Sequence, residues 1–133
     1  RMTPVLDKAA AMAGQGVILR GPVPKTQLVG ELAEARALLY RGDIGETFCS
    51  AVAEAQAMGV PAVLGDIACM NERVIQGETG WCVDAEDTFV RHAVEILTDD
   101  AEWRRLHRAC LAKQRAWRWD QAAAEFERIG RLG

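Results

Sequence analysis

Two glutamates, Glu46 and Glu54, are eight positions apart around the predicted beginning of a helix. Glu46 falls in the loop that follows a short apolar run, and Glu54 falls about two turns into the next helix. Both side chains can therefore face the same crevice. Carboxylate oxygens accept hydrogen bonds from paired sugar hydroxyls, and the unpaired N–H groups at a helix start attract a phosphate. The pattern predicts a site for a sugar nucleotide.

Each of these glutamates also has a plainer interpretation, because most glutamates are solvated surface residues. Other reactive side chains are less promising. His92 and His107 lie on predicted helices without a carboxylate or cysteine at ligand spacing, so they are expected at or near the surface. Cys49 lies at a predicted helix N-terminus, a place that can activate a thiol, but no base is identifiable beside it. A thiol nucleophile is therefore not expected.

Short apolar runs alternate with helical stretches along most of the chain. The predicted strands cover residues 16–22, 37–40, 60–65 and 81–83. The predicted helices cover residues 6–13, 24–33, 48–58, 84–100, 101–116 and 120–129, with at most a short helix at 71–75. Strands that are apolar throughout are typical of a parallel sheet covered by helices on both faces. The sequence predicts one doubly wound, Rossmann-like α/β domain over residues 1–133. In such a domain ligands bind in the loops at the carboxyl ends of the strands, here after Leu19, Tyr40 and Leu64.

The overall charge and composition exclude several classes of partner. The formal net charge is -3, and hydrophobic residues make up 50% of the chain, as in ordinary globular proteins. The sequence therefore predicts no nucleic-acid partner and at most a peripheral contact with a membrane. The segment 103–119 is basic and interleaved with aromatic residues, which would also suit a membrane surface. A shared helical face of Trp103, Leu106, Cys110 and Trp117 favours packing on the sheet instead.

The four cysteines are widely spaced, with no Cys-x-x-Cys pair. They are interpreted as small buried hydrophobic residues with free thiols, which favours the reducing cytoplasm. No apolar run reaches the length of a spanning helix, and no charged-then-apolar leader opens the chain. A cytoplasmic location is expected.

The segment around the two glutamates resembles the Glu-x7-Glu motif of the retaining GT-B-fold glycosyltransferases, the group 1 family that uses nucleotide-activated hexoses. Glu46 and Glu54 have the required spacing, and the run Glu-Ala-Gln-Ala-Met-Gly-Val-Pro-Ala-Val at 54–63 extends the match. Three further segments are similar to this family in the same order, at residues 17–23, 71–81 and 119–120. The resemblance implies that the predicted domain is the C-terminal half of a GT-B fold, truncated at its N-terminus.

The resemblance also implies a role for individual residues. Glu46 would be the catalytic residue that contacts hydroxyls of the donor sugar, and Glu54 would hold the ribose of the nucleotide. The remaining donor-binding residues would lie in two loops. In one loop, the backbone amides around Thr47, Phe48, Cys49 and Ser50 would face the pyrophosphate. In the other loop, after the first strand, lie Gly21 and Val23, and the Val23 position would face the base. The substrate would be a nucleoside-diphosphate sugar, whose hexosyl group passes to a glycan or a lipid-linked acceptor. No cofactor and no metal are expected in this family.

The sequence departs from the family's pattern near the predicted site. Gly42-Asp43 stands where the family has Pro-Ser, and Cys49 stands where it has a glycine. The family's Arg and Lys for the leaving diphosphate are not visible before the first predicted strand, and Arg20 is not assigned that role. The N-terminal domain that binds the acceptor is not visible either. We expect these 133 residues alone to be inactive and to need that domain as a partner.

Two alternatives remain open. The chain could be a non-catalytic, degenerate GT-B half that acts as a binding or association module. It could also be another GT-B enzyme such as a sugar-nucleotide epimerase, although the acid and base of such an enzyme are not identifiable here. A half deprived of its partner would expose an apolar face, through which it could form a homodimer.

Overall fold

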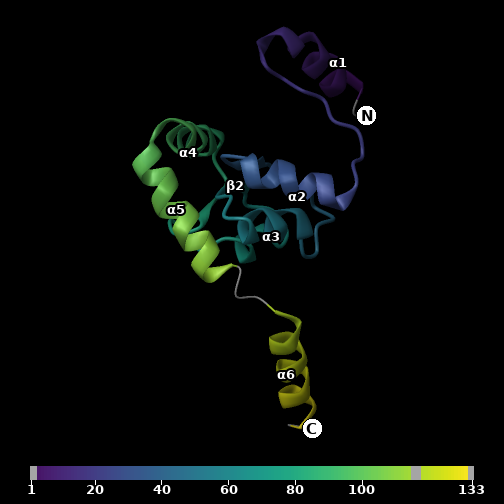
Figure 1. Cartoon of the computed structure of the whole chain (residues 1–133), viewed down its shortest axis with the longest axis vertical. Helices are drawn as coiled ribbons and strands as arrows, with labels where there is room; N and C mark the ends of the chain where they lie inside the picture. Colours follow the sequence, from purple (N-terminus) through teal and green to yellow (C-terminus); the bar gives the residue numbers. More distant parts are fainter. Residues whose placement is uncertain (1–2, 115–117, 132–133) are drawn as a thin grey trace. The chain divides into compact units, whose positions relative to one another are not determined.

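The computed structural model describes residues 3–114 and 118–131. It divides into two compact units, Arg1–Gly30 and Glu31–Gly133, and the boundary between them lies within one helix (Figure 1). The first unit contains the helix α1 (Thr3–Ala11), the short 3-10 helix η1 (Ala13–Gln15) and the beginning of α2 (Lys25–Glu34). The predicted helices at 6–13 and 24–33 are therefore confirmed.

The strand predicted at residues 16–22 is wrong. This segment forms no strand, and Ile18 and Leu19 in its centre are 71% and 51% exposed. The apolar run suggested burial, but a strand is stable only when its N–H and C=O groups pair with a neighbouring strand. In the part of the chain that the structure describes, the sheet does not extend to this run.

The second unit is built on a parallel sheet of three short strands: β1 (Leu38–Tyr40), β2 (Ala62–Gly65) and β3 (Gly80–Val83). The strand order is β1-β2-β3, with Leu38 opposite Ala62 and Ala62 opposite Gly80. These three strands and their parallel arrangement agree with the prediction. The close packing of β3 on β2 depends on Gly80, because a Cβ there would collide with the carbonyl group of Ala62.

Helices cover both faces of this sheet, and the central strand shows it most clearly. Every residue of β2 is buried. Ala62 and Leu64 pack with Val52 of α3 (Ser50–Ala57) and with the 3-10 helix η2 (Met70–Glu72). Val63 points to the opposite face, because successive strand residues alternate sides. There it packs with residues of α4 (Glu86–Thr98) and α5 (Asp100–Lys113), which lie side by side (Figure 1). The doubly wound α/β fold predicted from the sequence is confirmed.

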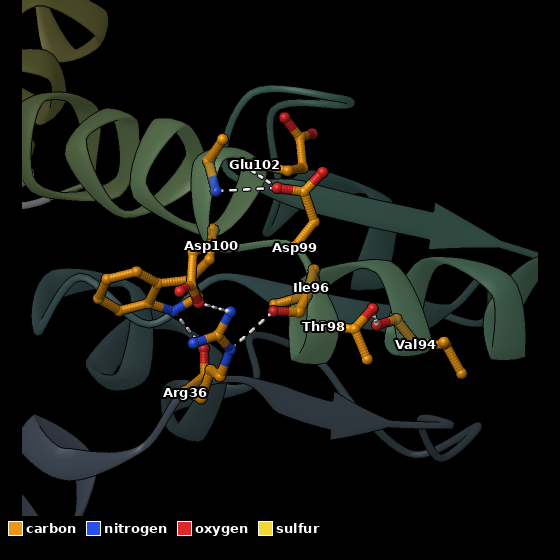
Figure 2. A network of polar contacts seen from close by, with 9 residues as sticks. Arg36, Val94, Ile96, Thr98, Asp99, Asp100 and Glu102 are labelled. Carbon is orange, nitrogen blue, oxygen red and sulfur yellow. Dashed lines mark hydrogen bonds and ion pairs between the residues drawn. The ribbon is translucent and has the colours of Figure 1, made fainter.

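Residues before β1 are joined to the α4–α5 connection by the network in Figure 2. The Arg36 guanidinium donates from Nε to the carbonyl of Ile96 at 2.9 Å and from Nη2 to the carboxylate of Asp100 at 2.7 Å. The indole Nε1 of Trp103 donates in return to the carbonyl of Arg36 at 2.8 Å. Bonds between residues 60 to 67 positions apart in the sequence fix α4 and α5 against the start of the sheet.

The helix α5 packs as the sequence predicts. Leu106 and Cys110 are fully buried, whereas Arg104 and Arg108 are exposed. The end of the predicted helix 101–116, together with Trp117, lies outside the described residues. The last helix, α6 (Trp119–Gly130), matches the predicted helix at 120–129 and buries none of its described residues.

No helix within the described ranges combines the length and apolar character that crossing a membrane requires.

Candidate functional site

The predicted catalytic loop follows β1 and leads into α3, at the carboxyl end of the sheet where α/β domains bind their ligands. The loop is closed by a turn around Asp43. Its carboxylate accepts a hydrogen bond from the amide of Gly45 at 2.8 Å, and its carbonyl accepts one from the amide of Glu46 at 3.1 Å. Asp43 thus shapes the loop that carries Glu46. Gly42 has a positive φ of 80°, and a Cβ there would collide with the side chain of Ile67.

The carboxylate of Glu46 is held by the last residue of β1. The hydroxyl of Tyr40 donates to Oε1 of Glu46 at 2.7 Å. This hydrogen bond, with partial burial and the negative charge of the carboxylate, raises the pKa of Tyr40 to about 12. The phenol therefore stays protonated at neutral pH and acts as a donor to Glu46.

Cys49 lies at the N-cap of α3 in a left-handed conformation, with φ 54° and ψ 72°. Residues other than glycine seldom adopt this conformation, which costs about 1 to 2 kcal/mol. The side chain is only 6% exposed, and burial raises the pKa of its thiol, assisted by the nearby carboxylate of Glu46. A thiol that stays protonated is a poor nucleophile.

The residues predicted to face a pyrophosphate lie at the entry to α3: Thr47 and Phe48 end the loop, Cys49 is the N-cap and Ser50 is the first helical residue. No side chain caps this end, and no acidic residue occupies the first turn. Because the first N–H groups of any α-helix lack partners within the helix, this end has the polarity that an anion prefers.

A cavity of about 450 Å³ lies beside α3. Its lining includes Phe48, Ala53, Glu54 and Ala57 from the α3 region, Glu72 and Arg73 after β2, and Gln114, Arg118, Trp119 and Ala122 from the C-terminal part. The structure thus brings two predicted donor-binding residues, Phe48 and Glu54, to one cavity. Glu46 is not among the described residues that line this cavity, so Glu46 and Glu54 do not face the same cavity.

Arg73 is a residue of this cavity that the sequence analysis did not single out. Its guanidinium carbon lies 4.2 Å from the centre of the Phe48 ring, and its Nη2 lies 3.7 Å from a carboxylate oxygen of Glu72. The side chain is 9% exposed. A planar cation stacked on an aromatic ring is a favourable arrangement. The motif at 71–81 pointed to this segment, but nothing in the spacing marked the arginine itself.

A polar cluster that includes Gln114 of the cavity lining fixes the segment that carries Arg73. The amide Nε2 of Gln56, on α3, donates to the carbonyl of Thr79 at 3.0 Å. The hydroxyl oxygen of Thr79 accepts from the amide of Ile75 at 2.9 Å and from Nε2 of Gln114 at 3.3 Å. Gln56 and Thr79 are fully buried, so the bond between them is shielded from water. Together the three bonds hold the turn after Arg73 against α3 and α5.

The other predicted donor-binding residues, Gly21 and Val23, lie in the irregular segment that precedes α2. They belong to the first unit, Arg1–Gly30, and their assignment to the base of a nucleotide stays a prediction. His92 and His107 both stack on tryptophan rings, Trp81 and Trp103 respectively, which fits their expected place at the surface boundary.

Curated proteins similar to this chain are glycosyltransferases. The chain is 30% identical over 113 residues to a GDP-mannose-dependent alpha-(1-6)-phosphatidylinositol dimannoside mannosyltransferase of Mycobacterium tuberculosis, a match that covers 79% of this chain and 29% of that protein. It is 35% identical over 81 residues to a D-inositol 3-phosphate glycosyltransferase of Xylanimonas cellulosilytica, which covers 59% of this chain and 19% of that protein. The chain therefore spans less than a third of the length of these relatives.

Residues 2–99, which include Glu46, Glu54 and Arg73, match the model of the glycosyl transferases group 1 family. This match covers most of the chain and the whole three-stranded sheet. The chain belongs to the glycosyl transferases group 1 family.

Proposed function

We propose that this chain is the donor-binding, C-terminal domain of a retaining glycosyltransferase, in which Glu54 binds the ribose of a nucleoside-diphosphate sugar and Glu46 contacts the sugar. The observation that carries the proposal is the cavity of about 450 Å³, which Glu54, Phe48 and Arg73 line together. Its volume lies in the range of small-molecule sites. A carboxylate for hydroxyl groups and a cation beside an aromatic ring are groups that a nucleotide can use.

The reaction proposed for the complete enzyme is transfer of a hexosyl group to a glycan or a lipid-linked acceptor with retention of the anomeric configuration. A second domain, N-terminal to this one, would bind the acceptor. The donor chosen for the first test is GDP-mannose, because a relative that covers most of this chain is named as dependent on it. All four cysteines are free, which supports a reducing cytoplasm as the place of the reaction.

The proposal is tested by thermal unfolding of the chain with GDP-mannose, UDP-glucose and ADP-glucose. A donor at about one hundred times its dissociation constant should add about 3 kcal/mol to the free energy of unfolding. The Glu54→Ala variant should bind this donor at least about tenfold more weakly, because a hydrogen bond to a charged group is lost.

Glu34→Ala is the matched control for this test. Glu34 is an exposed carboxylate at the end of α2 that does not line the cavity, so removing it changes the net charge by the same amount. The control should bind the donor as tightly as the unchanged chain. If none of the three donors raises the unfolding temperature, or if both variants lose affinity equally, the donor-binding role is wrong.

The proposed site uses no metal, with Arg73 and the N-terminus of α3 accommodating the diphosphate charge. Adding EDTA to the same titration should leave the affinity for the donor unchanged. A loss of affinity for the donor that Mg²⁺ reverses would show that a metal ion, and not these residues, balances the diphosphate charge.

A second candidate function, a non-catalytic association module, is favoured by one observation. The helix α6 exposes Trp119, Phe126 and Ile129, which are 90%, 77% and 55% exposed. Large apolar side chains on one side of a helix commonly mark a surface for association. Self-association of the chain without any donor binding would favour this second function.

A further inference from the structure

Tyr40 lies where β1 meets the irregular loop that carries Glu46. It is the last residue of β1, it pairs with Leu64 of β2 in the parallel register, and it packs on the core cluster that contains Val52 and Met70. Its backbone and ring are therefore fixed by the sheet. Its hydroxyl reaches out of this fixed frame to Oε1 of Glu46, at 2.7 Å.

Glu46 has no such support from its own element, because it lies in the irregular loop between β1 and α3. A glutamate in a loop can rotate about several side-chain bonds, and holding it in one orientation costs conformational entropy. A hydrogen bond to an ionised carboxylate is roughly twice as strong as one between neutral groups. The bond from Tyr40 therefore selects one orientation of the Glu46 carboxylate before any ligand arrives.

This bond leaves other acceptor positions of the Glu46 carboxylate available to a ligand. The two oxygens of an ionised glutamate offer about four acceptor positions, and Tyr40 occupies one of them. Hydroxyl groups of a sugar can bind at the others. The arrangement resembles other binding sites in which a residue that touches the ligand is held in place by a supporting hydrogen bond.

We propose that Tyr40 is a positioning residue for donor-sugar recognition, acting through Glu46 on the sugar part of a nucleoside-diphosphate sugar and not on its nucleotide part. This inference rests on the proposed function, because it requires that Glu46 contacts the donor sugar. It adds a residue outside the Glu46 and Glu54 motif, and it states which part of the donor that residue serves.

The substitution Tyr40→Phe isolates this role, because it removes the hydroxyl and keeps the ring that packs on the core. Calorimetric titration should compare GDP-mannose with GDP on the unchanged chain and on the variant. We expect Tyr40→Phe to weaken binding of GDP-mannose about five- to tenfold, through the loss of one charge-assisted hydrogen bond, and to leave binding of GDP unchanged. An equal loss for both ligands, or no loss for either, overturns the inference.

A double-mutant cycle tests whether Tyr40 acts through Glu46. Glu46→Ala alone should weaken binding of GDP-mannose, and adding Tyr40→Phe should weaken it no further, because Tyr40 then has no carboxylate to position. Fully additive losses overturn the inference. If the unchanged chain binds neither GDP-mannose nor GDP, the proposed function itself fails and the inference fails with it. If the unchanged chain binds both ligands and Tyr40→Phe weakens both equally, the inference fails but the proposed function stands.

The contact also has a spectroscopic signature, since Tyr40 is the only tyrosine of the chain. The ionisable groups that raise the pKa of Tyr40 are Glu46, Cys49 and Asp43, with the hydrogen bond to Glu46 as the largest cause. Ultraviolet titration should detect tyrosinate only near pH 12 in the unchanged chain, whereas Glu46→Gln should shift its appearance toward the ordinary value. Circular dichroism at each pH confirms that the chain is still folded. An unchanged titration in the variant overturns the inference.

Discussion

Cys49 combines a strained backbone conformation with a thiol of low reactivity. The resemblance to the family predicts a glycine at this position, and the φ of 54° lies in the region that glycine tolerates best. Its side chain nevertheless packs in the core cluster with Val52 and Leu64, so burial offsets part of the backbone strain. The departure from the family pattern at this position is therefore accommodated within the fold.

The same burial makes a prediction about reactivity. Because burial raises the pKa of the Cys49 thiol, the thiolate fraction at neutral pH is smaller than that of an ordinary cysteine, and alkylation should be slow. The pKa of Cys110 is raised to about 12 by burial, so it should react slowly as well. Mass spectrometry of peptides after iodoacetamide treatment checks this in the folded chain. Fast alkylation of Cys49 would contradict this prediction and would make Cys49 a candidate nucleophile.

Residue positions in the site were predictable from the sequence to a limited extent. The loop position of Glu46 and the helical position of Glu54 follow from spacing and from the Gly-rich and Ala-rich stretches around them. The bond from Tyr40 to Glu46 and the stacking of Arg73 on Phe48 do not follow, because they depend on side-chain orientation and on the folding of a distant segment. Arg73 and Phe48 are separated by 25 positions in the chain and meet only in the folded state.

At the scale of elements, local signals predicted most helices and three strands, and failed for the strand at 16–22. The runs at β1 and β2 resemble that segment in composition, but they have neighbouring strands with which to pair. A short apolar run contains no information about its partner, so the local pattern alone cannot distinguish a strand from an irregular apolar segment. The helices did not share this difficulty, because their hydrogen bonds form within the element.

The junction of α4 and α5 leads to a prediction about pH. The Asp99 carboxylate caps α5 by accepting from the amides of Ala101 and Glu102 at 2.8 and 3.0 Å. The bond from the Glu102 amide, and next the bond from the Ala101 amide, hold the pKa of the Asp99 carboxylate below its usual value. A lowered pKa means that the stabilisation is present above the pKa of the unfolded chain and is lost as pH falls through the folded value.

Asp99→Asn should therefore retain most of the cap at neutral pH and should lose less stability than the unchanged chain as the solution is acidified. Asp99→Ala should lower the unfolding temperature already at neutral pH, because no side chain then accepts from the two amides. Thermal unfolding of the three proteins from neutral pH down to about pH 3 checks both results, a range set by the ordinary pKa of aspartate. Parallel curves for all three would show that Asp99 does not cap the helix in solution.

At the scale of the whole molecule, the last helix leaves apolar surface without cover in the described part of the chain. Trp119, Phe126 and Ile129 lie at positions that share one side of α6. We expect the isolated chain to self-associate at high concentration, and Phe126→Glu to reduce this association. Sedimentation velocity over a range of concentrations measures it.

Gln121→Glu is the matched control, because Gln121 is exposed on another side of α6 and the change adds the same charge. The control should associate like the unchanged chain. A monomer at all concentrations, or an equal effect of both substitutions, would show that the apolar side of α6 is not a contact surface between copies.

The complete burial of β2 also bears on how this domain can change over evolutionary time. No residue of β2 reaches solvent, and its two sides face different helices, so a substitution there must satisfy two packed neighbours at once. The loop from 43 to 48 has no buried residue and is therefore under weaker packing constraint, and it contains the glutamate proposed to contact the sugar. If this glutamate contacts the sugar, mutations in the loop would alter the choice of donor while β2 keeps the scaffold intact. Selection for a new sugar would be expected to act first on the residues after β1.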